Sequence, residues 1–337
     1  MKQTHSGTRP ALLWLALLAL LCAVFIFSLF MGRFTIPPLE VFDILLRAVA
    51  RQAQESIQQS VVLNIRLPRT LMAMLVGAGL AISGAAFQGL FQNPLVSPDV
   101  LGVSNGAALG AVIGIMLAGY DFRAMSLSLV FGILTVFLTY ALSRMGGSST
   151  VLSLVLGGMI MSSLMNACIS LCKYMADPTE KLPAITYWLM GSFSSASYRL
   201  LRLVALPILL GIAVIIALRW RINVLSMGDE ECIALGVNPV RTRNVIIIAA
   251  TLITASCVMA TGVIGWVGLV IPHITRMLFG VNHRFQIPAS CLLGAIFMTL
   301  VDVASRTLIA AEIPIGVLTA LIGAPFFAVI YKKRGAA

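Results

Sequence analysis

The sequence predicts an all-α polytopic membrane protein with about ten transmembrane helices. Three observations support this fold class. Of the 337 residues, 59% are hydrophobic. Only 10% are charged, whereas a soluble domain carries about 25% charged residues. Apolar runs of the ~20 residues that a helical span needs fill the chain. Because they leave no room for a separate soluble domain, we expect one transmembrane domain over residues 1–337.

Ten apolar runs follow one another, and each predicts a helix. Their approximate ranges are 11–31, 70–91, 100–119, 124–143, 151–172, 200–218, 245–264, 266–280, 289–310 and 314–331. The first run is too long for a signal-peptide core and lacks a small-x-small cleavage site, so we expect a retained span. The eighth run is short and contains Pro272, which predicts a broken or partly buried helix.

The even number of runs places both termini on the same side of the membrane. Basic residues near both ends, among them Lys2 and Arg334, favour the cytoplasm for that side. Over the whole chain, however, this orientation places 12 Lys and Arg residues inside and 11 outside, so the overall charge bias is almost nil. With this orientation, residues 32–69 form a periplasmic segment, and its amphipathic part from Leu39 to Val49 lies along the membrane surface. Residues 219–244 then form a cytoplasmic loop.

The loop 219–244 contains the signal of a short helix. Gly228 and Asp229 can open a helix whose first turn carries acidic residues, and Gly236 can close it. One interpretation is a well-capped loop with no further role. The other is a docking helix for a soluble partner at the membrane face.

No catalytic constellation is present in the sequence. The nucleotide loop G-x-x-x-x-G-K-[ST] and the motifs H-E-x-x-H and G-x-S-x-G are absent. The six cysteines form no C-x-x-C pair and the three histidines are dispersed, so no metal site is expected. The formal net charge of +11 is scattered over the span ends, which indicates contact with the bilayer surface rather than nucleic acid.

Carboxylates inside the apolar runs are nearly absent, although an ion-coupled carrier needs them on its ion path. Asp302 is followed by Arg306 four residues later, a spacing typical of a local ion pair. If this chain transports a substrate, we therefore expect the energy for transport to come from a partner protein.

Small residues recur in the runs and indicate close helix packing. Gly102, Gly106, Gly110 and Gly114 form a small-xxx-small ladder in the third run. A weak echo relates Ser83-Gly84 to Thr261-Gly262. It is compatible with related inverted halves, as found in many transporters.

Nine short motifs then occur in a characteristic order. They are Ile65–Thr70, Gly77–Gly84, Gln92–Leu95, Leu101–Gly106, Gly228–Gly236, Gly268–His273, Asp302–Arg306, Glu312–Gly316 and Gly323–Phe326. Each motif is weak alone, but together the chain resembles the FecCD-type permeases over nearly all of its length after about residue 30. These are the membrane subunits of binding-protein-dependent ABC importers for iron chelates, haem and vitamin B12.

The resemblance implies a type II ABC importer permease fold with inverted-repeat halves in a bacterial inner membrane. It implies a homodimer, or a pair with a related permease subunit. It further implies two cytoplasmic ATPase subunits, which hold ATP and Mg, and a periplasmic substrate-binding protein. The chain itself would then be a transport subunit, with no enzymatic activity and no cofactor of its own.

The resemblance also assigns residues to four sites. The ATPase-coupling residues are Gly228, Asp229, Glu230, Glu231, Ala234, Leu235 and Gly236. The residues for binding-protein docking are Arg66, Arg69 and Arg306, although the first two are also suited to anchoring at the interface and Arg306 to pairing with Asp302. The cytoplasmic gate is Ser148, Ser149 and Thr150. The pathway lining is Ser153, Gly157, Met161, Met165 and Asn166, for which an ordinary helix–helix seam is the alternative.

Within the family, an iron chelate (a siderophore complex or haem) is the first expectation for the cargo. Vitamin B12 and a molybdate-type oxyanion are the alternatives within the same architecture. An ion-coupled secondary carrier is the alternative from another class, and the scarcity of buried carboxylates argues against it.

Overall fold

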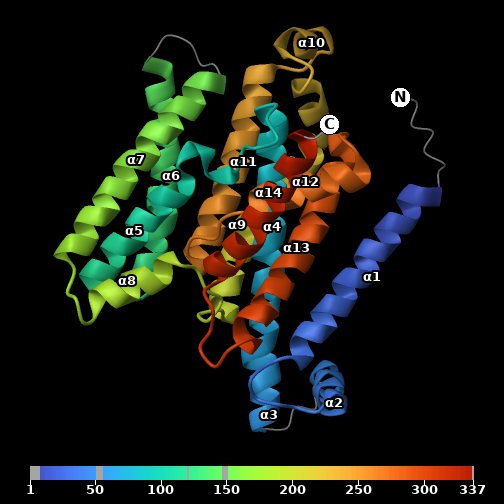
Figure 1. Ribbon diagram of the computed structural model, residues 1–337, viewed down its shortest axis with the longest axis vertical. Helices are drawn as coiled ribbons and strands as arrows, with labels where there is room; N and C mark the ends of the chain where they lie inside the picture. The colour runs from blue at the N-terminus through green and yellow to red at the C-terminus, as the bar shows by residue number, and fades with distance from the viewer. Residues whose placement is uncertain (1–7, 51–55, 120, 146–150, 336–337) are drawn as a thin grey trace.

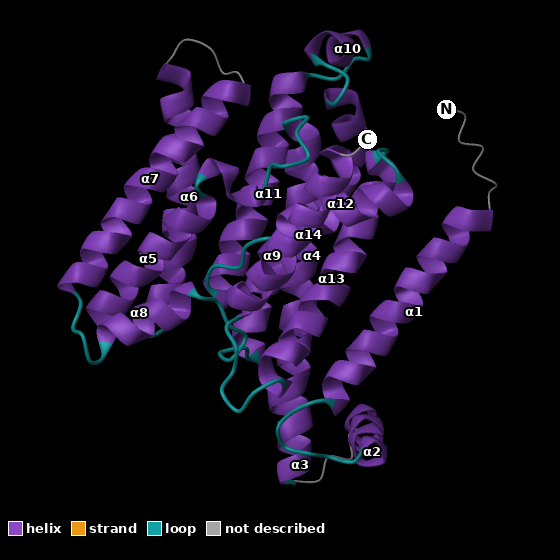
Figure 2. Cartoon of the chain, in the orientation of Figure 1, coloured by secondary structure: helices purple, strands orange, loops and turns teal. Residues whose placement is uncertain are grey.

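The computed structural model describes residues 8–50, 56–119, 121–145 and 151–335, and every regular element among them is helical (Figure 2). Seven helices are long and apolar enough to cross a membrane: α1 (Thr8–Phe30), α4 (Leu67–Leu90), α6 (Phe122–Met145), α7 (Val151–Met175), α9 (Tyr198–Leu225), α11 (Pro239–Thr261) and α13 (His283–Thr307). Three shorter apolar helices are α5 (Val103–Ala118), α12 (Val267–Phe279) and α14 (Ile315–Gly335). The ten predicted runs correspond one to one to these ten helices, which confirms the fold class.

Six short elements connect the long helices. They are α2 (Pro38–Val49), α3 (Ile57–Ser60), the π-helix η1 (Val61–Arg66), the 3₁₀-helix η2 (Pro98–Leu101), α8 (Lys181–Leu189) and α10 (Asp229–Ala234). Figure 1 shows α10 at the same end of the bundle as the start of α1 and the end of α14, whereas α2 and α3 lie at the opposite end. The described chain therefore starts and finishes at one end, as the even number of runs predicts.

Helix α4 lies at the centre of the bundle, packed against α9, α11, α12 and α13. On one side of this core, α5, α6, α7 and α8 form a separate group of helices (Figure 1). The predicted small-residue ladder on α5 faces α6 within that group: a Cβ added at Gly110 would lie 2.3 Å from the Leu127 carbonyl oxygen. The two backbones therefore touch, as small-xxx-small spacing predicts.

Helix α12 is continuous across Pro272, and the break expected in this run comes just before it, at residues 262–266. Because proline has no N–H, Pro272 cannot donate to the Gly268 carbonyl one turn earlier. That carbonyl faces α4, where a Cβ added at Gly84 would lie 1.8 Å from the Gly268 oxygen. The proline and the two glycines thus form one feature, a close crossing of α4 and α12.

Candidate functional site

The short helix α10 is defined by a glycine at each end. Gly228 precedes it with φ of 128° and Gly236 follows it with φ of 74°, both in the region that favours glycine. Asp229, Glu230 and Glu231 fill the first turn, where the helix dipole favours negative charge. The next helix begins at once, because the Asn238 side chain accepts a hydrogen bond from the Arg241 N–H.

One face of α10 is fixed to the bundle. Cys232 is fully buried. Burial and the negative charge of Asp229 raise the pKa of its thiol, so it acts as a neutral, apolar anchor. Arg243 at the start of α11 pairs with Asp229 at 3.0 Å and gives α10 a second attachment to the bundle. The sequence shows opposite charges around this helix, but not that Arg243 and Asp229 pair.

The other face of α10 is exposed in the part of the chain that the structure describes. Ile233 is 67% exposed and Leu235 is 53% exposed, and the carboxylates of Glu230 and Glu231 are exposed beside them. A six-residue helix would be marginal alone in water. Here the anchored face holds it in place, so an apolar and acidic surface stands rigidly at this end of the bundle. All seven predicted coupling residues lie in this one segment.

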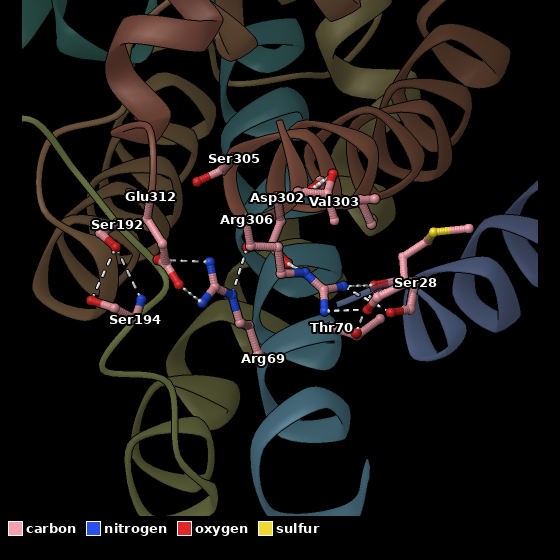
Figure 3. Close-up of polar contacts among 12 residues, drawn as sticks. Ser28, Arg69, Thr70, Ser192, Ser194, Asp302, Val303, Ser305, Arg306 and Glu312 are labelled. Carbon is pink, nitrogen blue, oxygen red and sulfur yellow. Dashed lines mark hydrogen bonds and ion pairs between the residues drawn. The ribbon is translucent and has the colours of Figure 1, made fainter. Parts of the chain in front are cut away.

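A buried network of charges lies at the other end of the bundle (Figure 3). Arg69 of α4 binds Asp302 of α13 through Nε at 2.8 Å. Its two terminal nitrogens bind both carboxylate oxygens of Glu312, at 2.9 and 3.1 Å. Arg306 contacts the second oxygen of Asp302 at 3.2 Å, which confirms the ion pair expected from their spacing. One guanidinium thus connects α4 to α13 and to the loop before α14.

Glu312 is the most accessible carboxylate of this network. Burial raises the pKa of its carboxyl, but the hydrogen bonds and charge of Arg69 lower it more, so its pKa lies below the ordinary glutamate value. A lowered pKa means that the Arg69–Glu312 pair stabilises the fold at neutral pH. That stabilisation is lost only as the pH falls through the lowered value.

Arginines also bind the end of α1. Arg306 donates to the carbonyl oxygens of Met31 and Ser28, at 2.9 and 2.8 Å. Arg66 donates to the carbonyl oxygens of Leu29 and Phe30, at 2.7 and 3.0 Å. The last carbonyls of a helix have no partner within it, and a cation there also suits the helix dipole. Two arginines therefore satisfy and fasten the C-terminal end of α1.

The three arginines predicted to dock a binding protein are all buried. Arg66, Arg69 and Arg306 are 3%, 7% and 5% exposed, and their donors are engaged inside the chain. The structure thus gives each one an internal contact. Their part in docking stays a prediction, and it would require the network to exchange partners. Arg69 and Arg306 pair with the two carboxylates Asp302 and Glu312. Arg66 binds backbone carbonyls, so its positive charge is not offset by an ion pair among the described residues.

The residues predicted to line the pathway lie on different faces of α7. Met161 and Met165 are buried in a cluster with side chains of α5, and Gly157 lies against the Thr139 carbonyl of α6. Within the chain these three residues lie in a helix–helix seam, and their part in lining the pathway stays a prediction. Asn166 is exposed and Ser153 half-buried. The predicted gate residues Ser148, Ser149 and Thr150 lie outside the described residues.

Comparison with known proteins agrees with this architecture. The model of the FecCD transport family matches residues 20–333. The molybdate import permease MolB of Haemophilus influenzae is 42% identical over 95% of both chains. An iron chelatin transport permease of Helicobacter pylori is 40% identical over 82% of this chain and 83% of its own length.

A solved structure of an inward-facing metal-chelate-type ABC transporter superposes with a TM-score of 0.83 at 40% identity, covering 95% of this chain and 98% of that one. The family match spans nearly the whole chain. The structure agrees with it, since it has ten apolar helices and an exposed short helix between α9 and α11. The chain therefore belongs to the FecCD transport family and is the permease subunit of an ABC importer.

Proposed function

We propose that this chain carries a metal-bearing cargo into a bacterial cell as half of a membrane pathway driven by a separate ATPase. The observation that carries the proposal is α10, which is anchored on one face and free on the other. Residues Gly228 to Gly236 fit a cleft on a cytoplasmic ATPase. Closure of that cleft on nucleotide binding would move α10 as a rigid body and the long helices α9 and α11 with it.

The distribution of charge supports an external energy source. Asp302 is fully buried and two arginines contact it, while Asp99 of η2 accepts a hydrogen bond from the Ser104 hydroxyl. A carboxylate held in this way is poorly placed to bind and release a coupling ion. ATP and Mg therefore belong to the partner subunit in this proposal, and this chain converts the partner's movement into a change of its own helices.

Assembly follows from the same reasoning. We place α10 and both ends of the described chain on the cytoplasmic side, with α2 and the arginine network facing the periplasm and its binding protein. Two copies of the chain, or this chain and a related permease subunit, would enclose the pathway between them. The exposed face of α7, which carries Asn166, is available to line it.

Replacing Leu235 by arginine is expected to uncouple transport. The substitution puts a charge on the exposed apolar face of α10 and leaves the Cys232 anchor intact. We expect ATP-driven uptake by the reconstituted complex to fall by about tenfold or more, as for the loss of an interface hot spot, while ATP hydrolysis continues. Ile57→Arg is the control, because Ile57 is 72% exposed at the opposite end. Normal coupled uptake by Leu235→Arg would contradict the docking role of α10.

For the cargo we propose an iron chelate first. The likeness to an iron chelatin permease and to a metal-chelate-type transporter supports this choice. The likeness to the molybdate permease is of similar identity and covers more of the chain, so molybdate is the second candidate. The discriminating measurement is uptake of radiolabelled ferric siderophore and of molybdate by vesicles that contain the whole complex. Saturable, ATP-dependent uptake of the chelate is the expected result, and uptake of molybdate alone would overturn this assignment.

A further inference from the structure

An apolar groove separates α6 from α11 along the outer surface of the bundle. Its volume is about 380 Å³. Both helices expose large hydrophobic side chains along it: Phe137 is 66% exposed and Ile248 is 67% exposed. The full lining is Ile133, Val136, Phe137 and Tyr140 from α6, and Asn244, Ile247, Ile248, Thr251 and Leu252 from α11.

The groove runs along the helices for less than half the thickness of a membrane. Its lining extends from Ile133 to Tyr140 on α6 and from Asn244 to Leu252 on α11. At 1.5 Å per residue this is about 10–12 Å, whereas one leaflet contributes about 15 Å of hydrocarbon. The groove therefore lies within a single leaflet, at the α10 end, where α6 finishes and α11 begins.

Two of the three polar side chains of the groove, Tyr140 and Asn244, lie at its α10 end, and the third, Thr251, lies two turns further along α11. The Tyr140 hydroxyl donates to the Asn244 side-chain oxygen at 3.1 Å and accepts from Arg144 Nη2 at 2.9 Å. The Arg144 guanidinium also lies over the Tyr140 ring, 4.6 Å from its centroid. These two contacts hold an otherwise long and mobile side chain in a defined position. The groove is thus largely apolar along its length and has a positive charge at its α10 end.

Arg144 has donors left for a ligand. It is exposed, and no carboxylate of the described residues lies within ion-pair distance of it. A guanidinium has five N–H donors in a planar fork that matches the oxygens of a phosphate. A fixed guanidinium at the membrane surface therefore suits a phosphodiester.

We propose that this groove binds one phospholipid of the leaflet at the α10 end, with an acyl chain between α6 and α11 and its phosphate on Arg144. A net negative headgroup fits best, because no carboxylate of residues 8–50, 56–119, 121–145 or 151–335 forms an ion pair that offsets the positive charge of Arg144. The site lies on the outside of the helix pair α6–α11, so it does not depend on the identity of the cargo.

The size of the groove favours an acyl chain over a second copy of this protein. A transmembrane helix with its side chains is about 10 Å across and cannot enter a groove of about 380 Å³, whereas a single hydrocarbon chain can. A free phosphate ion would use Arg144 but would leave the apolar lining uncovered. The groove and the guanidinium together point to a ligand that is apolar at one end and anionic at the other.

The test measures lipid retained by the full-length chain in its permease complex, purified in mild detergent, with native mass spectrometry. Phosphatidylglycerol is the anionic probe and phosphatidylcholine the zwitterionic one, and inorganic phosphate is added as a competitor. Arg144→Ala removes the phosphate ligand. Ile248→Trp fills the groove from its exposed rim. Arg123→Ala is the matched control, because Arg123 is an exposed arginine at the other end of α6.

We expect wild type and Arg123→Ala to retain phosphatidylglycerol alike and in preference to phosphatidylcholine. Losing a charge-assisted hydrogen bond should weaken retention by Arg144→Ala about tenfold or more. Ile248→Trp should lose both lipids. Equal retention of lipid by all variants would overturn the proposal, and so would equal retention of the two lipids by wild type. Displacement of phosphatidylglycerol by inorganic phosphate with the same affinity in wild type and Ile248→Trp would also overturn it.

Discussion

Replacing Asp302 by alanine is expected to lower the free energy of unfolding by about 3–5 kcal/mol, the usual cost of removing one partner from a buried ion pair. Asp302 is fully buried and contacts both Arg69 and Arg306. Without it, two guanidinium groups would lie close together inside the protein with Glu312 as their remaining carboxylate. The expected loss is measured by chemical unfolding of the detergent-solubilised protein, followed by its helical circular dichroism.

The control for this substitution is Asp43→Ala. Asp43 also pairs with an arginine, Arg47 at 2.8 Å, but both side chains are largely exposed on α2. An exposed pair contributes about 0–1 kcal/mol, so the control should unfold almost as wild type does. Glu312→Gln should fall between the two, because Glu312 lies at the accessible edge of the network. If Asp302→Ala were as stable as Asp43→Ala, the network would not hold α4 and α13 together.

Replacing Gly84 by alanine is expected to destabilise the protein by about 3 kcal/mol or more, at or above the upper end for overpacked cores. The added Cβ would meet the Gly268 carbonyl oxygen at 1.8 Å, and its three nearest neighbours are all backbone atoms of Gly268. No side chain can rotate out of the way, so α4 and α12 must separate. The measurement is the unfolding free energy in detergent, together with the yield of folded protein.

Gly265→Ala is the control for the crossing. A Cβ at Gly265 would have no neighbour within 4 Å, and Gly265 is not among the glycines with positive φ. We expect its free energy of unfolding to stay within about 0.5 kcal/mol of wild type. Equal stability of the two alanine variants would mean that α4 and α12 lie further apart than the structure places them.

The long helices could be predicted from the sequence because hydrophobic run length alone sets a span. The apolar runs that correspond to the short helices α5 and α12 can also be recognised in the sequence. Polar or glycine-containing segments mark the two ends of each run. The exposed helix α10 was predictable for a related reason. Its acids and its flanking glycines stand out in a chain that is otherwise apolar.

The internal contacts of the arginines could not be predicted in this way. Arg69 and Glu312 are 243 residues apart, and no local pattern relates them. In the sequence, Arg66 looks like any arginine that anchors a helix at the membrane interface. The lengths of the apolar runs do not show that the end of α1 lies beside it. Likewise, the pattern on α7 predicts one stripe of small and sulfur-containing side chains. Only the position of α5 decides that Met161 and Met165 face this chain's own helices.

The position of Gly84 is an intermediate case. The sequence shows that α4 is rich in small residues, and therefore that some helix packs closely against it. It does not show that the partner atom is the Gly268 carbonyl, or that Pro272 deprives that carbonyl of its usual donor. The inverted-repeat relation between the halves stays a prediction. Ser83-Gly84 lies within α4, whereas Thr261-Gly262 lies at the end of α11.

The fastening of α1 by two arginines has a consequence for biosynthesis. Arg66 follows α1 closely on the chain, but Arg306 binds Ser28 from 278 residues further along. As the ribosome makes the protein, α1 emerges long before α13, the helix that carries Arg306. Until α13 has been inserted, the end of α1 is held by Arg66, by the hydrogen bond between the Ser28 and Thr70 hydroxyls and by an apolar cluster with α2 and η1. The nascent chain must therefore keep α1 in the bilayer without its contacts to α13. The contacts between α1 and α13 can therefore form only after the helices from α4 to α12 have been made.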